Sequence, residues 1–429
     1  MDIFQKSLEM HEQYGGKFEI RAKVPVEDSY DLSLAYSPGV AAPCLEIEKN
    51  PSTVYDYTTK GNMVAVVTDG TAVLGLGDIG PEAALPVMEG KALLLKRFAN
   101  VDAVPICLDT KDVDEIVRTV KLIAPTYGGI NLEDISAPRC FEVEDRLRAE
   151  LNIPVFHDDQ HGTAIVVGAA LINALRIIDK DPANMKVVIN GAGAAGIAIL
   201  RILIQLGYVD IVVVDSTGII YKDRPEGMNP IKESIAHLTN PYNRRGGLDE
   251  AMVNADVFIG VSVADLLTED HIKSMANDPI VFALANPNPE ITYDNAKKWG
   301  VKIIGTGRSD YPNQINNVLA FPGIFRGALD VRATDINEDM KLAAVEAIAW
   351  LVSDEDLDVD FVVPKALDPR VAGVVAKAVG SAAIDSGVSV LFQQPEVAPD
   401  VIEAERALEQ VEEVVKAASE VVKTSSEAV

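Results

Sequence analysis

Cysteine is scarce in this sequence, and so is positive charge. The 429 residues include three cysteines, Cys44, Cys107 and Cys140. Their odd number, without any CxxC pair, argues against a disulfide framework and a zinc site, and it favours a reducing cytoplasm. Lysine and arginine number 38 against 65 aspartates and glutamates, which gives a formal charge of −27. We therefore expect no nucleic-acid partner and no binding to anionic membranes.

Long apolar runs are missing as well. No apolar run reaches transmembrane length, and residues 1–16 contain no signal-peptide core. Hydrophobic residues nevertheless make up 48 % of the chain, and Gly (30) and Pro (23) occur at ordinary frequency. The chain is too long for a single hydrophobic core. We expect a folded globular protein with two domains and an appendage.

Short apolar segments alternate with helical patterns along most of the chain, which is typical of a parallel α/β sheet. The pattern predicts strands over 63–68, 103–108, 129–132, 153–156, 186–190, 211–215, 256–261, 280–285 and 301–305. After about residue 330 the chain is Ala-rich and reads as helical. Spaced apolar side chains among many glutamates predict an amphipathic helix over 401–422.

Two acidic pairs follow two of the predicted strands. Glu133-Asp134 come directly after one strand, and Asp158-Asp159 come after the next. The carboxyl ends of neighbouring parallel strands open on one crevice, so these carboxylates would repel one another unless a divalent cation lay among them. All-oxygen ligands favour Mg²⁺ or Mn²⁺ over zinc. The alternative is that each acid only caps the helix that follows it.

Two further side chains are candidates for proton transfer. Lys91 lies in a predicted helix over 81–98 among alanines and leucines, where desolvation should lower its pKa toward that of a base. The alternative is a surface lysine whose stem packs on the apolar face. Tyr36 stands before a turn formed by Ser-Pro-Gly. Taken alone, this tyrosine is consistent with amphipathic surface packing.

A glycine-rich loop in the second half joins a predicted strand to a predicted helix. The loop consists of Gly191, Ala192, Gly193, Ala194, Ala195 and Gly196. The strand after that helix ends at Asp215, and this arrangement is the dinucleotide-binding fingerprint, with the pyrophosphate at the helix N-terminus and the acid on the ribose. Asp215 would repel a 2′-phosphate, which favours NAD, whereas Lys222 and Arg224 keep NADP open.

Two asparagines in the second half lie where side-chain amides can meet a ligand. Asn286 follows the predicted strand over 280–285, and Asn317 precedes the segment VLAFPG. An amide donates and accepts hydrogen bonds without charge, which suits a carboxylate or carboxamide partner. Alone, each asparagine is more simply explained as a turn residue.

Together these segments resemble a malic enzyme of the short prokaryotic type, from about residue 15 to residue 390. The resemblance is carried by motifs in the family order, namely SLAYSPGVA, VTDGTAVLGLGDIG, EGKALLLKRF, GGINLEDI, FHDDQHGTA, INGAGAAGIAI, ALANPNPE and NQINNVLAFPG. It implies a metal-dependent oxidative decarboxylation of L-malate to pyruvate and CO₂ with reduction of NAD or NADP. It also implies decarboxylation of oxaloacetate and a homodimer or higher homo-oligomer.

The resemblance further implies roles for single residues. Tyr36 would be the general acid and Lys91 the general base, with Asp158 as the acidic neighbour that tunes the lysine. The ligands of Mg²⁺ or Mn²⁺ would be Glu133, Asp134 and Asp159. The substrate would be held by Lys91, Asn286 and Asn317.

One motif departs from the family pattern. In larger eukaryotic-type members an arginine follows the TDG motif and binds a malate carboxylate, whereas this chain has Thr71-Ala72 there. Another donor must therefore hold that carboxylate.

The resemblance predicts an α/β substrate and metal domain over 1–160 and a Rossmann-type doubly wound parallel-sheet domain over 161–390. A helical acidic tail would follow over 391–429. Two alternatives remain: another nicotinamide dehydrogenase, such as an amino-acid dehydrogenase, or an inactive NAD-responsive regulatory protein. Neither needs the carboxylate metal site, so metal dependence separates them from a malic enzyme.

Overall fold

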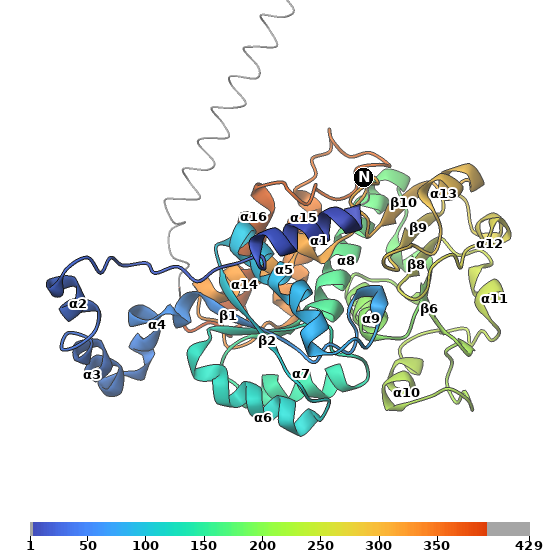
Figure 1. The fold of residues 1–429 in the computed structure, drawn as a ribbon. Helices are drawn as coiled ribbons and strands as arrows, with labels where there is room; N and C mark the ends of the chain where they lie inside the picture. Colours follow the sequence, from blue (N-terminus) through green and yellow to red (C-terminus); the bar gives the residue numbers. More distant parts are fainter. Residues whose placement is uncertain (1–2, 393–429) are drawn as a thin grey trace, which may run out of the picture.

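The computed structural model describes residues 3–392, which contain two separate sheets joined by one long helix (Figure 1). The first sheet is entirely parallel, with the order β2-β1-β3-β4. Its strands are β1 (Met63–Thr68), β2 (Asp102–Cys107), β3 (Gly129–Leu132) and β4 (Val155–His157). The connecting helices are α5 (Pro81–Ala99), α6 (Val113–Ile123) and α7 (Arg139–Glu150). The predicted strands of this half are present, with bounds shifted by up to two residues.

The second sheet has the order β10-β9-β8-β5-β6-β7, and only β7 (Gly218–Ile219) runs antiparallel. Its parallel strands are β5 (Lys186–Asn190), β6 (Asp210–Asp215), β8 (Val257–Gly260), β9 (Ile280–Ala283) and β10 (Ile303–Thr306). The chain builds outward from β5 first to β6 and later to β8 on the other side. Such a reversal creates a switch point at the carboxyl end of β5, where ligands bind in folds of this kind. The predicted Rossmann-type doubly wound sheet is confirmed.

Helix α8 (Asp158–Ile178) links the two sheets. Within residues 3–392 it is the one helix long and apolar enough to cross a membrane by length and composition. However, 67 % of its most apolar window is buried inside the protein, as expected for a core helix. The expectation that no segment reaches this length is therefore wrong, because isolated polar residues such as Asn173 and Arg176 interrupt the apolar run without making the segment polar on average.

The last described helices pack against both halves of the chain. They are α14 (Phe321–Asp330), α15 (Glu338–Trp350) and α16 (Arg370–Asp385). One hydrophobic core contains Val64 of β1, Val187 of β5 and Val375 of α16, so these helices join the sheets rather than belonging to one. The predicted domain boundaries at 160 and 390 stay predictions. The predicted helix over 401–422 lies outside the described residues.

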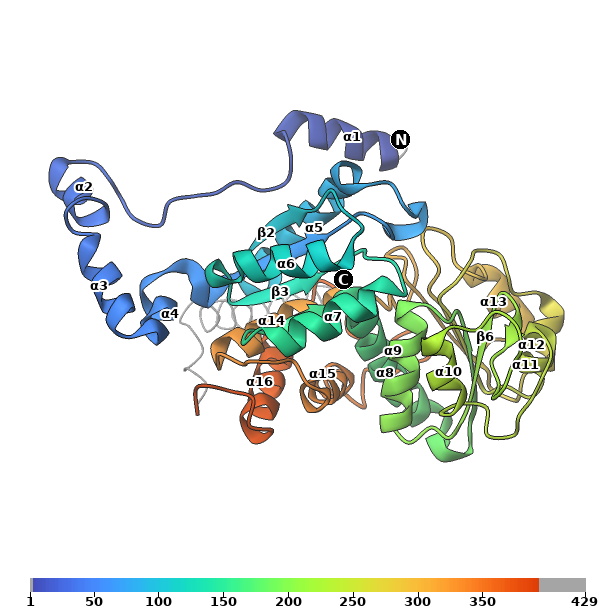
Figure 2. The ribbon, with the colours of Figure 1, turned by 90° about the horizontal axis from the view of Figure 1, so that it is seen from below.

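The N-terminal segment is built from α1 (Ile3–Tyr14), α2 (Ser29–Ala35), α3 (Ala41–Lys49) and α4 (Val54–Tyr57). None of these four helices contains a buried residue. Figures 1 and 2, seen from two directions, both show α2 and α3 projecting away from the two sheets. This part of the chain therefore contributes nothing to the core of its own protomer.

Candidate active site

The two acidic pairs meet at one edge of the first sheet. Strands β3 and β4 are parallel neighbours, so the residues that follow them leave the sheet at the same level. One carboxylate oxygen each from Glu133, Asp134 and Asp159 lies within 4.8 Å of the others. The convergence expected from the sequence is present, while the role of these side chains as metal ligands stays a prediction.

Local backbone geometry brings the carboxylates together. Asp134 adopts a left-handed conformation with φ 54°, and its backbone N–H donates to Oδ2 of Asp159 at 2.7 Å. Asp158 and Asp159 occupy the first turn of α8, and the N-cap position, His157, makes no side-chain capping bond. Helix capping therefore does not explain this second acidic pair.

Lys91 lies between two carboxylates. Its Nζ is 2.5 Å from Oδ2 of Asp158 and 2.9 Å from Oε1 of Glu133. It also lies 4.1 Å from the ring centroid of Phe321, at the start of α14. The residue is 7 % exposed, so it is not a surface lysine whose amine reaches water.

The pKa of Lys91 differs from the sequence prediction. Burial lowers it, but the charges of Asp158 and Glu133 outweigh burial and raise the pKa of the lysine above its usual range. The prediction of a lowered pKa is therefore wrong for this arrangement. Its premise, burial among apolar residues, is right, but it omitted the carboxylates that face the amine.

The same burial acts on the carboxylates in the opposite direction. It raises the pKa of Asp158 to about 7 and that of Glu133 to about 7, although Lys91 partly offsets the effect in both. For Asp159 burial raises the pKa to about 6, with a further rise from Asp158. Carboxylates that resist ionisation this strongly are stabilised by a nearby cation. An all-oxygen set of this kind fits Mg²⁺ or Mn²⁺.

Two amides complete this cluster. The side-chain N–H of Asn317 donates to Oδ2 of Asp158, so Asn317 does reach the group around Lys91. The other amide, Asn131, is fully buried in β3 and donates to Oε2 of Glu133 at 2.8 Å. Sequence reasoning missed Asn131. Its signal was a polar residue inside an otherwise apolar strand, two positions before an acid.

Asn286 lies at a different place. It is exposed in the turn after β9, and a Cβ added at Gly75 would lie 2.0 Å from its carbonyl oxygen. The glycine-rich loop after β1 therefore packs directly on this turn of the second sheet. Contact between the Asn286 side chain and a substrate stays a prediction.

The loop that departs from the family pattern is held by an arginine from α7. Arg139 donates to Oδ2 of Asp69 at 2.8 Å and to Oγ1 of Thr71 at 2.9 Å. Sequence reasoning did not single out this residue. Its guanidinium orders the loop around Asp69 and Thr71, where the sequence departs from the expected pattern.

The glycine-rich loop after β5 needs its glycines for separate physical reasons. Gly191 has φ +126°, and a Cβ at Gly196 would lie 1.8 Å from the carbonyl oxygen of Gly191. Gly193 caps α9 (Ala194–Gln205), and a Cβ there would meet nothing within 4 Å. A cavity of about 250 Å³ adjoins the loop and is lined by Ala137, Pro138, Phe141, Ala192, Gly193, Ile197, Asn229 and Ile231. The helix N-terminus thus faces open space suited to a diphosphate.

Asp215 ends β6 as predicted, but it is not a free acid. Its carboxylate accepts from both terminal nitrogens of Arg224, at 2.9 and 2.5 Å, and from Nζ of Lys232 at 2.7 Å. Burial raises its pKa, but these partners and the backbone N–H of Thr217 outweigh burial and lower it to about 2. The predicted repulsion of a 2′-phosphate by Asp215 is therefore offset by two cations. Lys222 is exposed.

Tyr36 is not near this cluster in its own chain. It is the C-cap residue of α2 and 69 % exposed, in the segment that projects from the body in Figures 1 and 2. The other predicted proton-transfer groups, Lys91 and Asp158, lie on α5 and α8 inside the body. Within one chain the structure does not bring the predicted acid to the predicted base.

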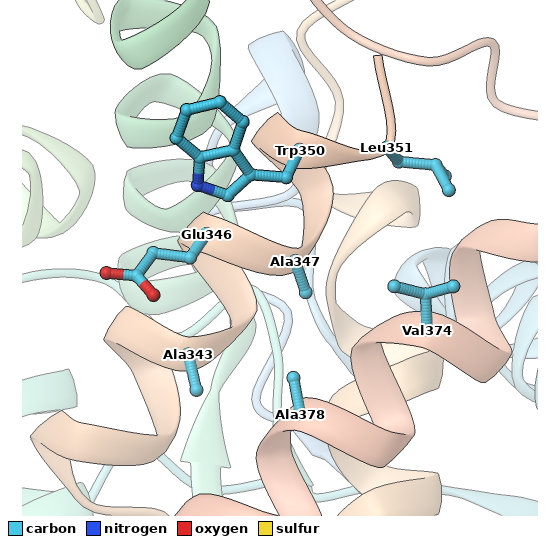
Figure 3. A pocket seen from close by; sticks show the side chains of 7 residues that line it. All are labelled: Ala343, Glu346, Ala347, Trp350, Leu351, Val374 and Ala378. Atoms are coloured by element: carbon cyan, nitrogen blue, oxygen red, sulfur yellow. The ribbon is translucent and has the colours of Figure 1, made fainter. Parts of the chain in front are cut away.

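Another groove lies between α15 and α16 and has a volume of about 280 Å³ (Figure 3). It is lined by Ala343, Glu346, Ala347, Trp350, Leu351, Val374 and Ala378. With a single carboxylate and otherwise apolar walls it offers no acid–base pair or ligand set. This groove is therefore not a candidate for the active site.

Comparison with known families matches both halves of the chain to domains of one kind of enzyme. The malic enzyme N-terminal domain matches residues 15–148, and the malic enzyme NAD-binding domain matches residues 160–384. This chain belongs to the malic enzyme family. The resemblance that the motifs indicated is thus confirmed across both sheets.

Individual malic enzymes are similar over most of this chain. The bifunctional malic/malolactic enzyme of Bacillus subtilis is 62 % identical over 396 residues, which cover 92 % of this chain and 97 % of that protein. The NADP-dependent malic enzyme of Haemophilus influenzae is 51 % identical over 90 % of this chain, but the match spans 53 % of that longer protein. The crystal structure of the NAD-dependent malic enzyme from Thermotoga maritima has a TM-score of 0.84 and 48 % identity, covering 89 % of this chain and 99 % of that one.

Proposed function

We propose that this chain catalyses the oxidative decarboxylation of L-malate to pyruvate and CO₂ with reduction of NAD or NADP. The observation that carries the proposal is the buried Lys91, bonded to Asp158 and Glu133 beside a three-carboxylate cluster. This cluster and a dinucleotide loop occupy one chain whose two halves both match the family. An amino-acid dehydrogenase or a regulatory protein would have no use for the carboxylate cluster.

In this proposal Lys91 takes the proton of the malate 2-hydroxyl, and a nicotinamide bound at the second sheet would accept the hydride from C2. The lysine must be neutral to accept this proton, and its carboxylate partners control whether it is neutral or charged. Glu133 is both a partner of Lys91 and a proposed metal ligand. A cation held by Glu133 would compete with the ammonium for this carboxylate, and it would thereby lower the pKa of Lys91 toward that of a base. Asp158, whose pKa is about 7, is placed to receive the proton.

The proposed ligands of Mg²⁺ or Mn²⁺ are Glu133, Asp134 and Asp159. When bound, the cation supplies Lewis-acid stabilisation of the negative charge that develops as CO₂ departs. Asn317 orients Asp158 through its amide, and Asn286 is proposed to meet the substrate from the second sheet. Tyr36 is proposed to return a proton to C3, which gives pyruvate.

The loop from Gly191 to Gly196 is proposed to hold the dinucleotide pyrophosphate. Relatives of similar identity are named NAD-dependent and NADP-dependent malic enzymes. The cations on Asp215 support use of both cofactors rather than NAD alone. We also infer a cytoplasmic location and a homodimer or higher homo-oligomer.

Initial rates with L-malate and each nicotinamide, with and without Mn²⁺, test the function. We expect turnover only with the metal. Because the Bacillus subtilis relative is named a bifunctional malic/malolactic enzyme, lactate should be measured beside pyruvate and oxaloacetate supplied as a second substrate. Metal-independent oxidation of malate, or oxidation of an amino acid instead, would refute the proposal.

Asp159→Asn tests the metal ligands separately. The variant should need much more Mn²⁺ for half-maximal rate, because one anionic ligand becomes neutral. Asp145→Asn, at an exposed position on α7, is the matched control and should behave as the parent. An unchanged Mn²⁺ requirement in a folded Asp159→Asn protein would remove Asp159 from the site.

A further inference from the structure

Glu290 is a buried acid at the carboxyl edge of the second sheet. Strands β8 and β9 are parallel neighbours in this sheet (Figure 1), and Glu290 ends the turn that follows β9. The residue is 0 % exposed, although it belongs to the polar turn sequence NPNPE. The proposed chemistry does not use this carboxylate. A buried acid nevertheless needs partners that offset the cost of removing it from water.

The partners of this carboxylate are the backbones of two different turns. Oε1 accepts from the N–H of Ser262, in the turn after β8, at 3.2 Å. Oε2 accepts from the N–H of Ala285, in the turn after β9, at 3.0 Å. Burial raises the pKa of Glu290, and the backbone N–H groups of the two turns act against that rise. One side chain therefore fixes the distance between the two turns.

The surrounding backbone leaves room for the Glu290 side chain and holds it in place. Gly260 is the last residue of β8, and a Cβ added there would lie 2.3 Å from Oε1 of Glu290. The backbone carbonyls of Pro289 and Glu290 accept from the N–H groups of Asp265 and Leu267, at 3.1 and 2.9 Å. The two turns are thus joined through both the side chain and the main chain of this segment.

The same two turns border the two proposed ligand sites. Ser262 accepts through Oγ from the side-chain amide of Asn190 at 2.6 Å, and Asn190 ends β5 directly before the glycine-rich loop. The turn after β9 contains Asn286, and a Cβ at Gly75 in the loop after β1 would lie 2.0 Å from the Asn286 carbonyl oxygen. Glu290 therefore joins a turn beside the dinucleotide loop to a turn that packs on the first sheet.

The order of the strands indicates which half of a dinucleotide these turns would meet. In folds of this kind the acid at the end of the strand after the glycine-rich loop holds the adenosine ribose. That strand is β6, on one side of β5, whereas β8 and β9 lie on the other side. A dinucleotide with its pyrophosphate at the glycine-rich loop would therefore extend its nicotinamide half over the turns after β8 and β9.

We propose that Glu290 is a positioning residue for the nicotinamide half of the cofactor and acts through the two turns that it joins. The proposal rests on the proposed function, in which the loop from Gly191 to Gly196 holds a dinucleotide. Because Glu290 is buried, its effect on the cofactor is indirect. Loss of the carboxylate should let the two turns shift relative to each other, while the contacts to adenosine and pyrophosphate stay in place.

Glu290→Gln tests this role with two ligands, of which only one carries a nicotinamide ring. The glutamine keeps the shape of the side chain but turns an NH₂ group toward one of the two backbone N–H donors, so one turn loses its acceptor. Calorimetric titration should show that NADH binds about tenfold more weakly, in the range expected for the loss of one hydrogen bond to a charged group. ADP-ribose, which lacks the nicotinamide, should bind as it does to the parent. Neither measurement needs turnover.

Asp256→Asn is the matched control. Asp256 directly precedes β8, at the opposite edge of the same sheet, and its carboxylate also accepts from a backbone N–H, that of Lys186, at 2.9 Å. This variant should bind both ligands with the parental affinities. Equal weakening of NADH and ADP-ribose in Glu290→Gln, or equal weakening of NADH in both variants, would indicate a generally loosened sheet and overturn the proposal. Parental NADH affinity in Glu290→Gln would overturn it as well.

Glu290→Asp is the second variant, in case the glutamine protein does not fold. Its carboxylate keeps the charge but is one methylene shorter, so it can reach only one of the two turns, and the same selective loss of NADH affinity is expected. The parent separates this role from the proposed function. A parent that binds both ligands but does not oxidise malate would contradict the proposed function, and the titrations would still decide the role of Glu290. A parent that binds neither ligand would refute both.

Discussion

Lys91 experiences two opposing influences, and their balance decides its role. Burial favours the neutral amine, while Asp158 and Glu133 favour the ammonium and prevail. The three groups form one proton-sharing unit that the substrate hydroxyl and a metal ion would enter together. A single substitution at Lys91 therefore removes the base and also leaves two buried carboxylates without their cation.

Lys91→Ala should lower malate oxidation by about 10²–10⁴-fold, the usual cost of losing a positioned base. The rate should be measured at saturating Mn²⁺, so that an altered metal affinity does not contribute. Lys96→Ala on the same helix is the control, because that side chain is 52 % exposed and pairs only with groups outside the site. Equal losses in the two variants would show that helix damage, rather than chemistry, is being measured.

Lys232 is the residue through which cofactor choice can be changed most cleanly. Asp215→Ala would leave the buried Arg224 without a counter-ion, whereas Lys232→Ala keeps the bidentate Asp215–Arg224 pair. Loss of this cation should lower kcat/KM for NADP relative to NAD by about tenfold, the equivalent of one charge-assisted hydrogen bond. Lys273→Ala, at an exposed position where the lysine pairs with Glu269, should leave the ratio unchanged. A constant ratio in Lys232→Ala would exclude Lys232 from 2′-phosphate recognition.

At the scale of elements, the turn between β5 and α9 separates folding from binding within one motif. A methyl group at Gly196 would collide with the carbonyl oxygen of Gly191, while one at Gly193 would enter open space. Gly196 is needed for the chain to close the turn. Gly193 keeps clear the space that we assign to the pyrophosphate.

Gly196→Ala should therefore destabilise the protein by about 1–3 kcal/mol, the usual cost of overpacking. Gly193→Ala should keep the parental Tm and weaken dinucleotide binding instead. Thermal unfolding without cofactor, followed by titration with NADH, distinguishes the two effects. A lowered Tm in both variants would contradict the separation.

At the scale of the whole molecule, a second buried network connects distant elements, and it is centred on Glu144 of α7. Its carboxylate accepts a hydrogen bond from the side-chain amide of Gln160 at 2.9 Å. Its other oxygen lies 2.7 Å from Nε2 of His161, and both partners are on α8. Lys341 of α15 lies 3.5 Å from His161 and is buried. The network thus joins the first sheet, the linking helix and the C-terminal helices. Burial raises the pKa of Glu144, but His161 and Lys341 outweigh burial and lower it to about 2.

A carboxyl whose folded pKa lies below its unfolded value of 4.5 stabilises the protein above pH 4.5, and this contribution is lost as the pH falls toward 2. The shift corresponds to about 3 kcal/mol. The stability gap between parent and Glu144→Gln should therefore be largest near neutral pH and shrink below pH 4.5. Urea unfolding at several pH values measures it, with Glu142→Gln, exposed on the same helix, as control. A gap independent of pH would mean that the charge of Glu144 does not stabilise the fold.

Much of this molecule follows from the sequence by itself. The strands, the glycine-rich turn and the positions of the acids after β3 and β4 depend on side-chain period and backbone conformation, which involve residues a few positions apart. The parallel arrangement then makes strand ends converge, so the cluster of Glu133, Asp134 and Asp159 could be expected before any coordinates. The motifs are also local stretches of the sequence, and their order along the chain was enough to indicate the family.

Only the tertiary structure decided the charge state of Lys91, the pairing of Asp215 and the exposure of Tyr36. Lys91 and Asp158 are 67 positions apart in the chain, and Asp215 meets Lys232 through a loop whose path no local pattern specifies. Electrostatic free energies depend on distances of a few ångströms between such groups, and on what excludes water from them. A periodic pattern gives the elements but not these distances, and it cannot show that α2 and α3 project from the body with their apolar side chains exposed.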